Sequence, residues 1–475
     1  MRKIIIVLGI LLVAGFTASA SPGYKITIKI DGMEDTVLYL AHYFGDKTYL
    51  ADTAYHSKKG HFVFQGEKSL DGGIYIVAGQ NNNKLFEMMI DKEQSFSASA
   101  SAPDIFGSLQ FRNSIENELF YKYIRANVAS QKELERLGTI LKTLPIGSDS
   151  LELIQKEIDT TRINAEGFRE QMIQQGEGTF LSVMLRAMIE PDPLKLLVNE
   201  KEKQDSLVLY KIYKRHFWDQ FDVSDDRLLR TPLYHKRLEH YFNRVVYQQT
   251  DSIIAAIETF IPLVEPNPET FKYVVWYLTY KFETSMIMGF DEIFVHMVDS
   301  YYSADKAFWA DSTVVRSLQK RADALRNVLI GATAPNLIII DTTGSFVSLH
   351  HQPAPYLFVF FYEMGCGHCK KELDELKAWM EKDDIGVQVF AVNTDTSLVQ
   401  WKNYINENKL PFIHANATRS ITPRYHDLYD ISSTPTIFLL DENKKIIAKR
   451  LKVSQMVSYL QHYHQRRYDE PGNSY

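Results

Sequence analysis

The chain contains only two cysteines among its 475 residues, and they stand three positions apart, at Cys366 and Cys369. The apolar run Leu357 to Tyr362 before them is typical of a buried strand, and Lys370 to Glu381 after them has helical spacing. Unpaired N–H groups and the helix dipole at such a junction stabilise an anion, which favours thiol chemistry. We therefore expect Cys366 to be the attacking thiolate and Cys369 the resolving thiol.

Other roles for this cysteine pair fit the sequence less well. A disulfide that closes so small a loop would add only about 2 kcal/mol on the chain-entropy model, which is little for a large protein. A c-type haem site needs His after the second cysteine, where Lys370 stands, and a zinc site needs two further ligands at the right spacing. A non-catalytic disulfide therefore remains the main alternative to a redox pair.

The N-terminus has the pattern of a secretory signal peptide. Two basic residues precede an apolar run from Ile4 to Phe16, and Ala18-Ser19-Ala20 offers a cleavage site of small residues. The run is shorter than the ~20 apolar residues that cross a bilayer, and no other run approaches that length. We expect residues 1–20 to be removed, which leaves an exported protein without stable membrane insertion.

Charge and motif patterns argue against several function classes. The formal net charge is -6, and the sequence has no basic block beyond Arg466-Arg467, so no nucleic-acid partner is expected. Asp222 to Asp226 begins like a calcium loop, but Arg227 stands where the turn needs Gly. The 14 histidines include no H-E-x-x-H motif. We predict no metal site.

The pattern of apolar and polar residues divides the mature chain into three predicted domains. Residues 21–104 alternate apolar and polar positions, as from Tyr24 to Ile30, and predict a small antiparallel β domain. Residues 105–330 have apolar residues three and four positions apart and predict an all-α domain with an aromatic core. Strand and helix patterns alternate over 331–468, which predicts an α/β fold, and 469–475 is expected to be a frayed tail.

The last domain combines several motifs, which are Ala334-Pro335, the run from Cys366-Gly-His-Cys369 to Glu372, the strand Gly386 to Asn393, and Ser433-Thr434-Pro435-Thr436. With these motifs, residues 331 to about 465 resemble the thioredoxin fold, specifically the bacterial envelope branch typified by TlpA and ResA. The first two domains resemble the β and helical modules that precede such domains in multidomain envelope proteins of Gram-negative bacteria. Those modules imply no activity of their own.

The resemblance implies that Pro435 is a cis-proline that faces the cysteine pair. The Thr434 backbone would then be presented to an incoming peptide. The residue types agree with this, because cis bonds are essentially confined to X-Pro and a proline that opens a strand cannot donate to the sheet.

Two residues beside the cysteines are candidates for tuning them. His368 can hold positive charge or donate a hydrogen bond near Cys366, which would make the disulfide more oxidising. Glu372 matches a glutamate that the family places beneath the site to tune the cysteine pKa values, and a solvated helix carboxylate is the alternative. The chain departs from the family at Gly365, where Trp is usual, and at Leu373, where Pro is frequent, which leaves substrate preference open.

The leading hypothesis is an exported thiol–disulfide oxidoreductase in the periplasm of a Gram-negative bacterium. Its substrates would be protein thiols and disulfides, its upstream domains would position or select them, and a membrane thiol reductase would supply electrons if it works as a reductase. No metal or organic cofactor is expected. The alternative is an envelope binding or scaffold protein in which the thioredoxin-like domain is a non-catalytic docking module.

Overall fold

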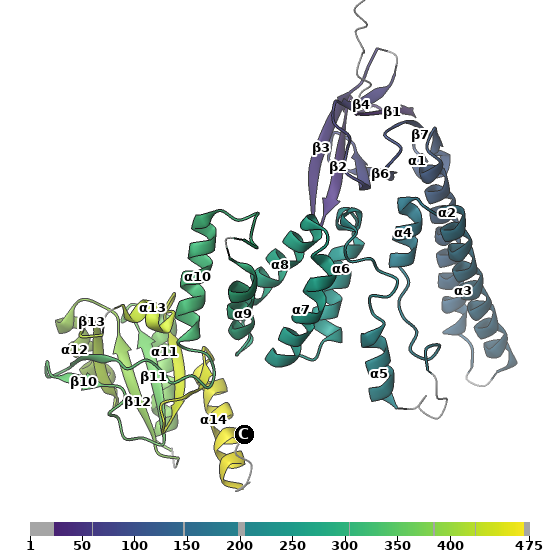
Figure 1. Cartoon of the computed structure of the whole chain (residues 1–475). Coiled ribbons are helices and arrows are strands. Elements are labelled where there is room, and N and C mark those ends of the chain that lie inside the picture. The colour runs from purple at the N-terminus through teal and green to yellow at the C-terminus, as the bar shows by residue number, and fades with distance from the viewer. Residues whose placement is uncertain are drawn as a thin grey trace, which may run out of the picture. The chain divides into compact units, whose positions relative to one another are not determined.

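The computed structural model describes residues 23–58, 60–145, 148–197, 205–303, 305–382, 385–422 and 424–469 (Figure 1). The expected signal peptide and the tail from residue 470 onward lie outside the described residues. The chain forms two compact units, a first unit Met1–Val245 and a second unit Val246–Tyr475. This division falls inside the stretch 105–330, and the boundaries of the three predicted domains stay a prediction.

Two four-stranded sheets begin the first unit, with strand orders β4-β1-β7-β8 and β3-β2-β5-β6. The strands are β1 (Tyr24–Asp31), β2 (Val37–Phe44), β3 (Lys47–Tyr55), β4 (Phe62–Gly66), β5 (Gly73–Ala78), β6 (Lys84–Ile90), β7 (Ser95–Ser101) and β8 (Gln110–Arg112). The period-two pattern of β1 places Ile26 and Ile28 in the core. Only β1 and β7 pair in parallel among these described strands, because several strands separate them and no hairpin sets their direction.

Helices complete the first unit. They are α1 (Ile105–Ser108), α2 (Ile115–Leu141), α3 (Asp149–Gln175), α4 (Phe180–Ala187), α5 (Ser206–Arg215), the 3₁₀ helix η2 (Asp226–Arg230), α6 (Leu233–His240) and the π-helix η3 (Tyr241–Val245). Helices α2 and α3 pack against each other, and the side chains of Ser114 and Ser148 cap their N-termini. The expected aromatic core is present at Phe217, which is fully buried.

Four helices open the second unit, α7 (Thr250–Val264), α8 (Pro268–Glu283), α9 (Asp291–Tyr301) and α10 (Ser312–Arg326). The segment Pro266-Asn-Pro268 separates α7 from α8, where the Asn267 side chain caps α8 and Pro268 occupies its first turn. Val274 and Leu278 are buried, as their spacing predicts, whereas Trp276 and Tyr280 are exposed.

A seven-stranded sheet follows, with the strand order β10-β9-β13-β12-β11-β14-β15. Its strands are β9 (Ile338–Asp341), β10 (Phe346–Ser348), β11 (Tyr356–Tyr362), β12 (Val387–Asn393), β13 (Ile413–Ser420), β14 (Thr436–Asp441) and β15 (Ile446–Lys449). Strands β11, β12 and β13 are parallel, and β14 runs antiparallel to β11. Every residue of β11 is buried, as its continuous apolar run predicts.

Helices cover both faces of this sheet. They are α11 (Gly367–Met380), α12 (Leu398–Asn408), α13 (Tyr425–Tyr429) and α14 (Val453–Asp469). Phe358 and Phe360 pack with residues of α11, α12 and α14 on one face. Val359 and Phe361 pack with residues of α13 on the other face. This is the thioredoxin-like α/β fold that the sequence predicts, at the end of a multidomain chain.

Three elements of this fold differ from the sequence-based expectation. Helix α11 begins at Gly367, three residues before the predicted start, because Cys366 caps it. Helix α13 spans only Tyr425–Tyr429, whereas the sequence pattern favours a helix over the longer stretch from Ile421 to Tyr429. Strand β13 is not predicted at all, because its small and polar residues, such as Ala415 and Asn416, lack the β-branched pattern of a buried strand.

Lys449 joins the sheet of the second unit to the helices that precede it. Its ammonium group forms an ion pair with Asp291 at the start of α9 and donates to the carbonyl oxygen of Val328 at 2.5 Å. The Lys449 backbone N–H also donates to Met288 Sδ at 3.5 Å. The Lys449 side chain is only 3% exposed, so burial lowers its pKa and the nearby Asp291 carboxylate opposes that shift.

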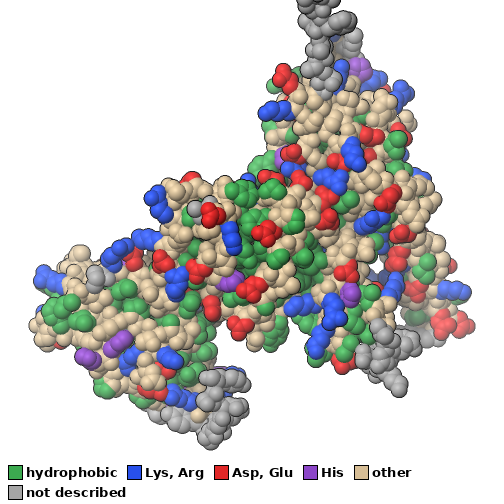
Figure 2. All heavy atoms as spheres, viewed as in Figure 1, with side chains coloured by type: hydrophobic (Ala, Val, Ile, Leu, Met, Phe, Trp, Pro, Cys, Tyr) green, Lys and Arg blue, Asp and Glu red, His purple; other side chains and the backbone are tan. Residues whose placement is uncertain are grey.

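Figure 2 shows basic and acidic side chains interspersed on one face, without a large patch of a single sign. No helix in the described ranges is both long enough and apolar enough to cross a membrane.

Candidate active site

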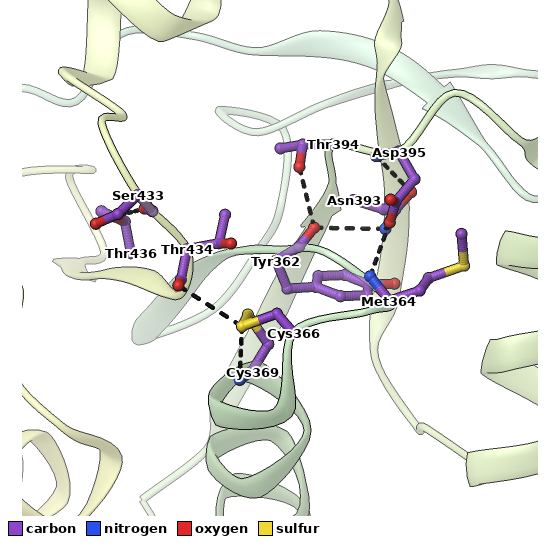
Figure 3. Close-up of a disulfide and its surroundings, with 10 residues drawn as sticks. All are labelled: Tyr362, Met364, Cys366, Cys369, Asn393, Thr394, Asp395, Ser433, Thr434 and Thr436. Atoms are coloured by element: carbon purple, nitrogen blue, oxygen red, sulfur yellow. Dashed lines mark hydrogen bonds between the residues drawn. A yellow bond between two sulfur atoms is a disulfide. The ribbon is translucent and has the colours of Figure 1, made fainter.

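The two cysteines form a disulfide at the N-terminus of α11 (Figure 3). Cys366 is the N-cap residue, and the backbone N–H of Cys369 donates to Cys366 Sγ at 3.1 Å. Cys366 is partly exposed, whereas Cys369 is fully buried one turn into the helix. An external thiol or disulfide can therefore approach the sulfur of Cys366 but not that of Cys369.

Thr434 and Pro435 lie beside Cys366, in the loop between α13 and β14. The peptide bond between them is cis. The Thr434 carbonyl oxygen lies 3.6 Å from Cys366 Sγ and points toward it (Figure 3). The structure thus brings together four of the six residues that the sequence singles out, which are Cys366, Cys369, Thr434 and Pro435.

His368 and Glu372 lie on the same helix but have different surroundings. His368 is exposed, and both residues line a cavity of about 650 Å³ that also reaches Pro435. Glu372 is 9% exposed, and its carboxylate accepts a hydrogen bond of 2.6 Å from the backbone N–H of Val453, the first residue of α14. Glu372 is therefore not a solvated helix carboxylate, which was the alternative to a tuning role.

Glu372→Ala should lower the free energy of unfolding by about 1–2 kcal/mol, because the Val453 N–H at the start of α14 loses its acceptor. Glu372→Gln keeps a side-chain oxygen and should cost less. Thermal denaturation of both variants, with the exposed Asp374→Ala on the same helix as a control, measures this. Equal stability of the Glu372→Ala and Asp374→Ala proteins would show that this hydrogen bond does not stabilise α14.

A polar network at the end of β12 holds the loop that precedes Cys366. The Asp395 carboxylate accepts hydrogen bonds of 2.8 Å from the backbone N–H of Met364 and from Asn393 Nδ2 (Figure 3). Asn416 in β13 donates to Asn393 Oδ1 at 3.0 Å. Sequence reasoning misses these residues, although polar side chains that end a buried strand, at Asn393 to Asp395, are a usable signal.

Asp395→Ala should lower the free energy of unfolding by about 1–3 kcal/mol and slow reactions at Cys366, because two N–H donors lose their acceptor and the loop loosens. The measurements are urea denaturation and the rate at which the reduced protein is oxidised by a small disulfide. The neighbouring exposed Thr396→Ala is the matched control. An Asp395→Ala protein that matches this control in both measurements would contradict a positioning role for Asp395.

Two buried aromatic side chains, Tyr362 and Trp401, belong to the same core cluster as Cys369. The indole N–H of the buried Trp401 donates to the Tyr362 hydroxyl oxygen at 3.0 Å. Burial raises the pKa of Tyr362 well above its ordinary value, so this phenol stays neutral. Within the described ranges, no group of three or more His, Cys, Asp or Glu residues is arranged to hold a metal ion.

Three segments of the chain match known families. Residues 330–449 match the AhpC/TSA family, residues 24–120 a domain of unknown function (DUF4369), and residues 196–326 another domain of unknown function (DUF5106). The match over residues 330–449 contains the whole disulfide site.

Several curated relatives share the description thiol-disulfide oxidoreductase ResA. The thiol-disulfide oxidoreductase ResA of Bacillus cereus is 28% identical over 138 residues, which are 28% of this chain and 77% of that protein. ResA of Bacillus subtilis is 28% identical over 119 residues, which are 25% of this chain and 64% of that protein. Among solved structures, a domain of a possible thiol-disulfide isomerase from Cytophaga hutchinsonii is 33% identical, with 30% of this chain and 98% of that chain covered and a TM-score of 0.28.

Proposed function

Because the C-terminal domain of this chain belongs to the ResA/TlpA-like thioredoxin family, we propose that the protein is a thiol–disulfide oxidoreductase. It would act on protein disulfides through Cys366 and Cys369. The observation that carries this proposal is the disulfide at the N-terminus of α11, with one sulfur accessible and the other buried. The attacking sulfur must be reached by a substrate disulfide, whereas the resolving sulfur needs to reach only the mixed disulfide.

The reduced protein would transfer two electrons in two steps. The Cys366 thiolate attacks one sulfur of a substrate disulfide, so that a Cys366–substrate bond forms and the other substrate sulfur leaves as a thiolate. The Cys369 thiolate then attacks Cys366 Sγ, which closes the Cys366–Cys369 disulfide and releases the second substrate thiolate. The substrate disulfide is reduced and the protein pair is oxidised, and the reverse sequence oxidises a substrate dithiol.

The surroundings of Cys366 favour its thiolate. As the N-cap of α11 it lies at the positive end of the helix dipole, and the Cys369 N–H donates to its sulfur. His368, in the first turn of α11, would add a hydrogen-bond donor or positive charge close to Cys366. Glu372 lies three residues after the buried Cys369, on the same face of α11. Its carboxylate would act electrostatically on Cys369 in addition to accepting the hydrogen bond from Val453.

The Thr434–Pro435 peptide would receive the substrate backbone, because it lies against Cys366 on the accessible side of the disulfide. Electrons for continued reduction would come from a membrane thiol reductase. The expected signal peptide places this activity outside the cytoplasm, in the periplasm of a Gram-negative bacterium. The reaction needs no metal or organic cofactor.

Two measurements on the purified full chain test this function. The dithiothreitol-reduced protein should reduce insulin disulfides, and its equilibrium with glutathione should give a potential above the about −270 mV of thioredoxin and toward the about −180 mV of protein disulfide isomerase. A thioredoxin-like potential would contradict the expected effect of His368. Failure to exchange electrons with insulin, with a small disulfide and with glutathione would leave a binding or scaffold protein with an idle disulfide.

A further inference from the structure

The cavity beside the disulfide is built partly from the helices that precede the thioredoxin-like fold. One wall comes from the end of α8 and the loop after it, through Glu283 and Met286, and from Arg321 on α10. The other wall comes from His368, from Pro435 and from Lys452 before α14. All of these residues belong to the second unit. We call this cavity the active-site groove.

The contacts of Lys449 fix the helical wall in place. Its buried ion pair with Asp291 and its hydrogen bond to Val328 hold β15 against the start of α9. Met288, in the same loop as Met286, packs against the core cluster that contains Cys369. The groove is therefore a defined surface next to the accessible sulfur.

The groove combines an exposed apolar group with three cationic side chains, those of Arg321, Arg450 and Lys452, and two carboxylates. Met286 is 91% exposed at the wall, which is unusual for a large apolar side chain. Glu283 pairs with Arg321 at 3.3 Å, Arg450 pairs with Asp430 at 2.6 Å, and the Glu372 carboxylate accepts a hydrogen bond from the Val453 N–H.

Two of the lining cations, Lys452 and Arg321, can form further ion pairs. The exposed Lys452 has no ion pair with any residue that the structure describes. The Arg321 side chain is 41% exposed, and the ion pair with Glu283 uses only its Nη1 atom among the described residues. A carboxylate in the groove would complement both groups.

We propose that the active-site groove binds the polypeptide segment that flanks the reacting cysteine of the substrate, and that it selects segments with an acidic residue and an apolar residue. The carboxylate would face Lys452 and Arg321, and the apolar side chain would lie on Met286. This proposal rests on the proposed function, because the segment reaches the groove only while its cysteine reacts with Cys366. It assigns part of the substrate selection to Met286 after α8 and Arg321 on α10, outside the thioredoxin-like fold, beside Lys452 within it.

The test uses three synthetic peptides, each with one internal disulfide, that differ only next to the first cysteine, where they carry Glu-Leu, Gln-Leu or Lys-Leu. The readout is the second-order rate constant for oxidation of the reduced full chain. The wild-type protein should react about fivefold faster with the Glu-Leu peptide than with the Lys-Leu peptide, and 0.5 M NaCl should reduce this ratio. Lys452→Glu should bring the ratio to about one or below it.

A second variant and two controls keep the outcome interpretable. Met286→Glu changes a side chain that is 91% exposed, so its fold should be unaffected, and it should also lower the ratio. Lys402→Glu and Val399→Ser are exposed positions outside the groove and should preserve the wild-type ratio. A wild-type protein without preference among the peptides, or a preference that Lys452→Glu leaves intact, would overturn the groove proposal.

A small uncharged disulfide, hydroxyethyl disulfide, separates this proposal from the proposed function. If the wild-type protein is not oxidised by it or by any peptide, the oxidoreductase function itself fails. If the wild-type protein is oxidised by it but does not discriminate among the peptides, only the groove proposal fails.

Discussion

Cys366→Ser should lower the rate of insulin reduction by about 10³-fold or more, because a serine hydroxyl cannot form the mixed disulfide that starts the exchange. The loss should be equally large with a small disulfide, since it concerns the reacting atom itself. Gly365→Ala is a suitable control, because an added Cβ there meets no other atom within 4 Å. A Cys366→Ser protein as active as wild type would rule out the enzyme and favour the scaffold alternative.

Cys369→Ala should stop the same reaction one step later. Cys366 can still attack, but the resolving thiol is missing, so the protein stays covalently attached to its substrate. Non-reducing electrophoresis followed by mass spectrometry of the trapped species identifies the substrate. The double variant Cys366→Ser/Cys369→Ala should trap nothing, and adducts in that protein would have to be non-covalent or artefactual.

Asp291→Ala should lower the free energy of unfolding of the second unit by about 3 kcal/mol at neutral pH. The substitution leaves the ammonium group of Lys449 buried, with the Val328 carbonyl oxygen as its remaining hydrogen-bond partner in the part of the chain that the structure describes. Urea denaturation, combined with hydrogen exchange of the β14 and β15 amides, measures the loss. The exposed pair of Asp299 with Arg326 is the matched control, and Asp299→Ala should cost no more than about 1 kcal/mol.

The pH dependence of this loss has a definite sign. Burial holds the pKa of Lys449 below its ordinary 10.5, so the unfolded chain binds more protons than the folded one between these two pKa values, and stability rises with pH across that window. Asp291→Ala removes the charge that opposes this shift, so the pKa falls further. The deficit of the variant should therefore shrink as the pH rises toward 10.5. A deficit that grows with pH would contradict a buried, charged Lys449.

The sequence predicts well those elements whose signal is local. The alternation from Tyr24 to Ile30 corresponds to β1, and the apolar run that ends at Tyr362 corresponds to the buried β11. Proline signals mark helix limits, because Pro266-Asn-Pro268 separates α7 from α8. The junction of strand and helix at the cysteine pair also follows from local pattern, although α11 begins at Gly367 and not at the predicted Lys370.

What the sequence does not predict depends on contacts between distant residues. The Asp395 carboxylate anchors Met364, 31 positions away, and Glu372 meets Val453, 81 positions away. Strand β13 is buried only because β9 and β12 flank it. The active-site groove needs the start of α9 to be held by Lys449. No periodicity or motif encodes such pairings, because they arise from the order of strands in the sheet and from side-chain packing.

The distance along the chain between Cys366 and Thr434 has a consequence for the order of folding. These residues are 68 positions apart, and they meet only when β14 has paired with β11. Such non-local pairing is slow compared with formation of a local helix. Until β14 has paired with β11, Cys366 and Cys369 therefore lack Thr434 beside them and are open to exchange with any nearby thiol. Completion of the sheet is the step that restricts the pair to substrates able to approach past Thr434.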